Sequence, residues 1–328
     1  MGTAVNNALD EMFNLIAATK IERLQREEWL EDIWEAYQED GMGYLDSTGE
    51  KWGILCGNED YSRDLASKWA ERMIDGLKLS WDKDKKEKYG GGYFRGTTVC
   101  LSSMLKAEKY QALIDLVEEA PYKWWHYCQF AAQALRELKR YDDAIKYAEE
   151  SKGLNDPKIL IDIFCEETLL DKGDWKIAYE QYALSANQKN TKVATFRAIK
   201  KKYPQFLEDQ ILKDLIDSSF GEEGKWFATA KTIGRLDIAL QLAKHHPCEP
   251  QTLNRAAEEF LEKNPAFSFE VAGASLKWMA LGYGYNLVIM MFGKQRGYLK
   301  KLVRPLTKRM SSPIFCTTLL TTIISTIL

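Results

Sequence analysis

Ala134-Leu135…Tyr141-Asp142-Asp143-Ala144-Ile145…Ala148 is a helical pattern that returns as Thr168-Leu169…Trp175-Lys176-Ile177-Ala178-Tyr179…Tyr182. The two copies, aligned on Ala144 and Ala178, define a 34-residue offset. A repeat of this length corresponds to one helix–turn–helix unit, which buries its apolar face only by stacking on its neighbours. We therefore predict an all-α fold: an α-solenoid of stacked helix–turn–helix repeats, built outward from this pair.

Weaker copies of the pattern lie on both sides of this pair. Leu113 precedes Ala144 by slightly less than one such period, and Ala239 follows Ala178 by about two periods. A last weak copy surrounds Glu270. A small residue at Ala144, Ala178 and Ala239 allows two helices to approach closely, and apolar residues one and four positions later extend the buried stripe. The pattern predicts helical repeats over 98–285.

The repeat resembles the tetratricopeptide-repeat superfamily in its 34-residue offset and its small residues at Ala144 and Ala178. The aromatic residues Tyr141 and Trp175 and the proline Pro157 agree with this resemblance. The likeness covers roughly 98–280. This part of the chain resembles the degenerate members of the superfamily, because the Trp…Leu-Gly…Tyr signature of first helices is missing. The resemblance implies stacked helix pairs. Ligand-binding residues of the family do not carry over, because they have no matching positions here.

The segments outside the repeats differ in composition. Apolar spacing of three and four residues over 3–38 and about 58–79 predicts an N-terminal helical region, 1–81. Residues 82–97 combine a charged run with Gly90-Gly91-Gly92 and predict a connector between domains.

The C-terminal segment 286–328 contains seven basic residues and no acidic residue, whereas 1–285 carries a net charge of −10. The run from Ile314 to Leu328 is apolar and rich in Thr, but it is short for a membrane-spanning helix. Three interpretations stay open for this tail: unselected sequence after a frameshift, a membrane anchor, or an ordinary helix. Membrane contact is expected only through Ile314–Leu328.

Composition narrows the functional classes. A formal net charge of −3 gives no broad basic field, so nucleic acid is not an expected partner. Six scattered Cys without a C-x-x-C pair are typical of free, buried thiols in a reducing cytoplasm. The start of the chain has no basic and apolar signal-peptide pattern.

Four stretches contain residue types that are common in metal, anion-binding or catalytic sites. His245-His246-Pro247-Cys248 has metal-ligand types but no second pair, so a helix end is the favoured interpretation and no metal is expected. The stretch around Arg95 could bind an anion if it opened a helix, although it is not a P-loop. Asp162, Glu166 and Glu167 share one helix, and Gly221–Phe227 is charged and glycine-bounded. Charged residues on repeat helices usually face solvent, so we expect no catalytic residue and no cofactor.

Aromatic and basic residues suggest a surface for a partner. Lys123-Trp124-Trp125-His126-Tyr127 is the most aromatic stretch, although an interior helix would have the same composition. The candidate partner residues are Trp124, Trp125, Tyr127, Arg95, Lys225 and Trp226. We expect a non-enzymatic, cytoplasmic helical-repeat scaffold that binds a protein partner. The alternatives are an accessory or regulatory domain of a nucleic-acid-linked system, as a fragment of a longer protein, and, third, an enzyme.

Overall fold

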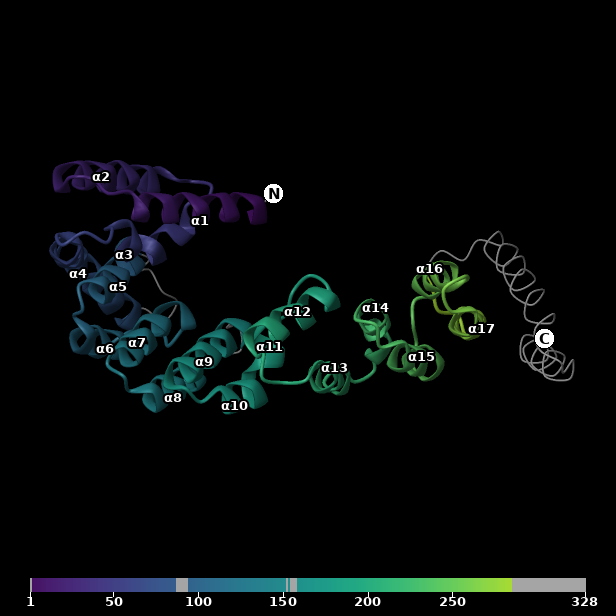
Figure 1. Cartoon of the computed structure of the whole chain (residues 1–328). Helices are drawn as coiled ribbons and strands as arrows, with labels where there is room; N and C mark the ends of the chain where they lie inside the picture. The colour runs from purple at the N-terminus through teal and green to yellow at the C-terminus, as the bar shows by residue number, and fades with distance from the viewer. Residues whose placement is uncertain (1, 87–93, 152, 154–157, 285–328) are drawn as a thin grey trace, which may run out of the picture. The chain divides into compact units, whose positions relative to one another are not determined.

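The computed structural model describes residues 2–86, 94–151, 153 and 158–284. These residues are mainly helical and include no strand, which confirms the all-α prediction for the described part of the chain. The chain divides into two compact units, Met1–Ala186 and Asn187–Leu328 (Figure 1).

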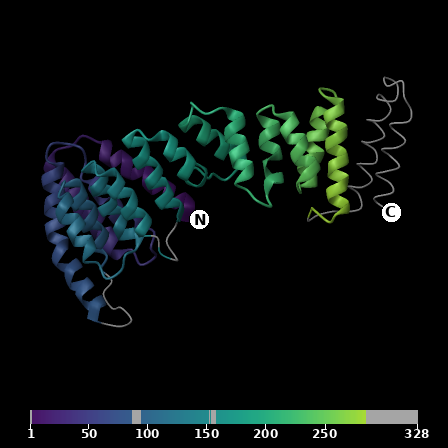
Figure 2. The ribbon, with the colours of Figure 1, turned by 90° about the horizontal axis from the view of Figure 1, so that it is seen from below.

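The first unit begins with two long helices and a short helical loop that leads to a third. Its helical elements are α1 (Gly2–Ala18), α2 (Arg23–Glu39), η1 (Asp46–Lys51), α3 (Trp52–Leu55), α4 (Ser62–Lys86), α5 (Gly96–Lys106), α6 (Tyr110–Glu118), α7 (Trp125–Glu137), α8 (Tyr141–Glu150), α9 (Lys158–Lys172), α10 (Trp175–Ala178), η2 (Tyr179–Ala183) and α11 (Leu184–Ala186). Figures 1 and 2 show α6 to α9 following one another along this unit, and each of these helices packs against the next.

Tryptophan rings form the core of the N-terminal region. Trp34 of α2 contacts Trp52 of α3 and Trp69 of α4, with ring centroids 5.9 Å apart in both pairs. Trp52 and Trp69 approach to 4.7 Å, and Trp52 is fully buried. Aromatic pairs in such tilted arrangements add to the hydrophobic stabilisation of burial. The apolar spacing of the sequence therefore corresponds to a real core.

The connector predicted at 82–97 joins two helices of one unit. Residues 82–86 continue α4, α5 begins at Gly96, and these two helices pack closely against each other. A Cβ at Gly76 would lie 2.7 Å from the Phe94 ring, and one at Gly96 would lie 2.5 Å from it. Both glycines thus leave room for the Phe94 ring, which a larger side chain at either position would displace. The compact units instead divide after Ala186.

Four helix pairs are joined by the same turn. In each, a residue with positive φ follows the first helix: Glu108 (58°), Lys139 (61°), Gly173 (92°) and Gly234 (84°). The amide of that residue donates to the carbonyl three residues earlier, and the next amide donates to the carbonyl five residues earlier. This is the Schellman motif, which satisfies the last carbonyls of a helix. The second helix then begins two residues after the positive-φ position.

The residue five positions after each of these turns is buried in every pair. It is Leu113, Ala144, Ala178 or Ala239, and each has an exposed fraction of 0%. The three small residues singled out in the sequence therefore lie at close helix contacts. The bulky residue three positions before each small residue is not always buried, because Trp175, which precedes Ala178, is 44% exposed.

Two tyrosines make equivalent contacts between successive second helices. The Tyr147 hydroxyl interacts with Glu118 of α6 and lies 4.0 Å from Cys128 Sγ, and the Tyr182 hydroxyl donates to Glu149 Oε1 of α8 at 2.7 Å and neighbours Cys165. Tyr147 lies three residues after its buried alanine but Tyr182 lies four after. The π-helical turn η2 accommodates the extra residue.

The second unit contains further helix pairs. Its elements are α12 (Lys192–Lys202), α13 (Glu208–Asp217), η3 (Glu223–Trp226), α14 (Phe227–Thr232), α15 (Leu236–His245), α16 (Pro250–Phe260) and α17 (Pro265–Ala280). Packing joins α12 to α13, α14 to α15, and α16 to α17. Pro250 and Pro265 each open a helix, where the missing amide hydrogen costs least.

The tail predicted at 286–328 lies outside the described residues, as do Gly90-Gly91-Gly92 and Pro157. Of the helices that are described, none combines the length and apolar character needed to cross a bilayer.

Candidate functional site

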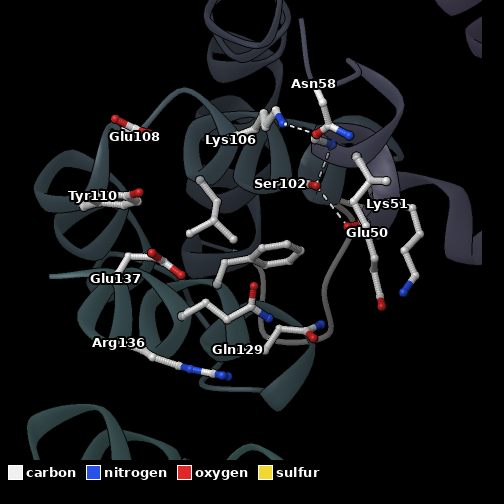
Figure 3. Close-up of a pocket in the computed structure, with 15 residues that line it drawn as sticks. Glu50, Lys51, Asn58, Ser102, Lys106, Glu108, Tyr110, Gln129, Arg136 and Glu137 are labelled. Carbon is white, nitrogen blue, oxygen red and sulfur yellow. Dashed lines mark hydrogen bonds between the residues drawn. The ribbon is translucent and has the colours of Figure 1, made fainter. Parts of the chain in front are cut away.

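A groove in the first unit lies between the loop helices η1 and α3 on one side and α7 on the other, with α5 between them (Figure 3). It encloses about 580 Å³. Asn58, Ser102 and Lys106 lie across the groove from Gln129 and Arg136 in Figure 3. The partner residues singled out in the sequence do not line this groove, but Arg95 and Tyr127 line a smaller pocket beside it.

Hydrogen bonds of Ser102 fix one wall of the groove. Its hydroxyl accepts from the Gly53 amide at 2.9 Å and donates to the Glu50 carbonyl at 2.9 Å. A Cβ at Gly53 would lie 2.6 Å from the Ser102 carbonyl oxygen, so only glycine allows α3 to approach α5 this closely. Ser102 is itself buried, so these two hydrogen bonds are shielded from solvent.

The opposite wall is a polar stripe on α7. Gln129, Gln133, Arg136 and Glu137 recur at helical spacing and line the groove, while Ala131, a residue of the other stripe, is fully buried. Side-chain amides both donate and accept hydrogen bonds. This stripe was visible in the sequence as polar residues four and three apart, but it has no distinctive composition, and sequence reasoning missed it.

Charged groups at the rim are of both signs and are largely paired. Lys106 Nζ donates to Asn58 Oδ1 at 3.2 Å. Arg136 binds Asp171 Oδ2 of α9 at 2.5 Å and Glu167 Oε2 at 3.6 Å, and its side chain is 23% exposed. These contacts leave Lys106 and Arg136 at the border of the groove with partners on its own rim or on α9.

The smaller pocket, of about 180 Å³, is lined by Tyr37, Asp46, Phe94, Arg95, Thr97, Thr98, His126 and Tyr127. His126 Nδ1 lies 2.7 Å from Glu50 Oε1, which lines the groove, so this contact connects the two sites. The Arg95 guanidinium donates to the carbonyls of Tyr37, Gln38 and Asp40 at the end of α2. Arg95 therefore caps a helix C-terminus, which explains its position without a bound anion.

The aromatic stretch is divided between surface and core. Trp124 is 49% exposed and stacks on Tyr122, with ring centroids 4.8 Å apart. Tyr127 is half-buried and packs 5.9 Å from Trp124. Trp125 is 4% exposed and contacts Phe164 of α9. Trp125 is thus part of the core, because its ring packs against α9.

The remaining two candidates belong to the second unit. Trp226 is fully buried, and its Nε1 donates to Ser219 Oγ at 2.9 Å. Lys225 is exposed and pairs with Glu222. A Cβ at Gly224 would lie 2.0 Å from the Pro247 carbonyl oxygen. The glycine-bounded stretch is therefore a tight packing element, with Lys225 as its exposed member.

Two carboxylates on α9 are buried, which the sequence interpretation did not anticipate. Asp162 is 1% exposed and Glu166 is fully buried, while Glu167 faces solvent as expected. Lys158, one turn before Asp162, forms an ion pair with it. The expectation that charged residues of repeat helices face solvent was wrong for this pair, because they lie on the inner stripe of α9.

The histidine and cysteine stretch is explained by local contacts. His246 Nδ1 lies 3.3 Å from Glu223 Oε2, and burial raises the pKa of the Cys248 thiol to about 12. No cluster of three or more metal-ligand side chains occurs among the described residues. Cys56, Cys100, Cys128, Cys165 and Cys248 are all buried and free, as the sequence predicted for these five.

Comparisons of the chain with protein families, with curated proteins and with solved structures gave no match.

Proposed function

We propose that this protein is a non-enzymatic scaffold, an α-solenoid of tetratricopeptide-like helix pairs whose groove binds an extended segment of a protein partner. The repeat architecture is supported by the four identical turns, by the buried residue five positions after each, and by the equivalent contacts of Tyr147 and Tyr182. The five free thiols fit a cytoplasmic location.

The observation that carries the proposal is the groove lined by one face of α5 and one face of α7. Consecutive first helices of stacked pairs present such a face to solvent, and helical-repeat proteins use it for binding. Gln129 and Gln133 offer both donors and acceptors, which is what the main chain of an extended peptide requires. The partly apolar wall at Ile54, 42% exposed, supplies a surface for a side chain.

Selection of displayed peptides on the full chain tests this proposal. Peptides recovered in this way should bind in solution, and the double change Gln129→Ala with Gln133→Ala should weaken them by about tenfold, or about 1.4 kcal/mol. Lys146→Ala on the exposed side of α8 is the matched control and should leave binding unchanged. Equal binding by the groove variant and the control would place the peptides elsewhere and reject the groove.

A further inference from the structure

The segment 187–207 has a charge pattern unlike the rest of the chain. It holds six basic residues and no acidic one, whereas acidic residues outnumber basic ones in the whole sequence, 48 to 45. Protein surfaces usually intersperse both signs, and a field of one sign attracts an oppositely charged partner.

Helix α12 displays most of these charges. Its inner stripe is Thr195, Phe196 and Ile199, all buried. Arg197 and Lys201, four residues apart, project together from the opposite, exposed side. Lys189 is exposed just before the helix. We call Lys189, Arg197, Lys200 and Lys201 the basic face.

Acidic residues at the start of α13 and before η3 have basic partners outside the basic face. Helix α12 packs against α13 and α14. At the start of α13, Asp209 forms an ion pair with Arg235. Glu222 of the preceding loop pairs with Lys225. In the described part of the chain, none of the four residues of the basic face forms an ion pair.

An apolar side chain lies beside the basic face. Lys200 Nζ donates to the Phe206 carbonyl at 2.8 Å and so holds the 203–207 loop against the end of α12. The next residue, Leu207, is 76% exposed. A basic face that ends near an exposed leucine matches a ligand that carries both carboxylates and an apolar side chain.

We propose that the basic face of α12, with Leu207, binds a short acidic protein segment that contains an apolar residue. Nucleic acid fits these observations less well. The basic face is only one helix of 11 residues, about 16 Å long, on a chain of negative net charge. No aromatic residue of α12 is exposed for stacking on bases, since Phe196 is buried. This surface is separate from the groove of the first unit, so either proposal can fail alone.

Fluorescence anisotropy with the full chain tests the basic face. The probes are a labelled peptide of alternating Glu and Leu, the same peptide with Gln in place of Glu, a single-stranded oligonucleotide, and vesicles containing phosphatidylserine. The Glu-containing peptide should bind, with an affinity that falls as salt is added, and the Gln peptide should not. The double variant Arg197→Glu with Lys201→Glu should weaken that binding by about tenfold or more, or about 1.4 kcal/mol.

The double variant Lys20→Glu with Lys146→Glu is the matched control, because it changes the net charge equally at exposed sites outside α12. Circular dichroism verifies that both variants remain folded. The proposal is rejected if the control weakens binding as much as the α12 variant, or if the acidic peptide fails to bind. It is also rejected if the oligonucleotide or the vesicles bind more tightly than the peptide in a way that depends on Arg197 and Lys201.

Discussion

Single residues determine the turns that join the helix pairs. Gly173 and Gly234 adopt φ values of 92° and 84°, where an L side chain is strained. A Cβ at either position would meet no atom within 4 Å. A substitution therefore destabilises the fold only through the strained backbone conformation, and not through a steric clash. Gly173→Ala and Gly234→Ala should each lower the free energy of unfolding by about 1 kcal/mol in denaturant titrations.

The control for this prediction is Gly273, which lies within α17 and has open space around its Cβ position. Gly273→Ala should raise the free energy of unfolding by about 0.5–1 kcal/mol, because the unfolded chain loses conformational freedom. If Gly173→Ala and Gly234→Ala raise the free energy of unfolding as Gly273→Ala should, the turns do not have the conformation described.

The buried alanines provide a second test at this scale. Ala144→Leu and Ala178→Leu should each destabilise the protein by about 1–3 kcal/mol, because both positions are fully buried and a larger side chain would separate the helices. Lys146→Leu, on the exposed side of the same helix as Ala144, should change stability by less than about 0.5 kcal/mol. Unchanged melting in both alanine variants would contradict the packing.

The sequence predicted these alanines because a 34-residue period and a small residue are visible without a structure. It could not predict that Glu108 and Lys139 adopt the same positive φ as two glycines, because neither side chain favours that conformation. It also could not separate Trp124 from Trp125, since neighbouring aromatic residues on a helix can point to the surface or to the core.

At the scale of elements, the tyrosine contacts link successive second helices. Tyr147→Phe and Tyr182→Phe should each lower the free energy of unfolding by about 1 kcal/mol, because the hydrogen bonds to Glu118 and Glu149 are lost. Tyr141→Phe on α8 is the control and should have a smaller effect. Thermal unfolding followed by circular dichroism measures the differences.

The contribution of Tyr147 should depend on pH. Its hydrogen bond, followed by that of Lys123, lowers the pKa of Glu118 below the usual value. A lowered folded-state pKa means that the stabilisation is complete above the ordinary glutamate pKa of about 4.3 and is lost as the pH falls through the folded-state pKa. The gap in melting temperature between the native chain and Tyr147→Phe should therefore narrow below about pH 4. A gap that widens with acidity would contradict this contact.

The sequence could not reveal that Tyr147 and Tyr182 are equivalent, because they differ by one position relative to the buried alanines. The π-helical turn in η2 absorbs that difference, and such a turn has no reliable sequence signal. The groove was missed for a related reason. Its lining comes from α3, α5 and α7, and only the packing of these helices brings the residues together.

For the whole molecule, the division into units leads to a prediction about truncation. The connector expected at 82–97 joins helices that pack tightly, whereas the compact units divide after Ala186. A chain that ends at Ala186 should therefore remain helical and unfold cooperatively, because its core is complete within the first unit. A gradual, non-cooperative loss of circular dichroism on heating would show that the first unit depends on the second.

The most direct test of the proposed function is site-specific photo-crosslinking in the cells that produce the protein. A photoreactive amino acid that replaces Gln133 would lie in the groove, and one that replaces Lys146 would lie on the exposed side of α8. We expect the Gln133 position to crosslink reproducibly to one protein through a defined segment, which mass spectrometry identifies, and the Lys146 position to give no such product. Identical products from both positions, or no protein crosslink from Gln133, would contradict a partner-binding groove.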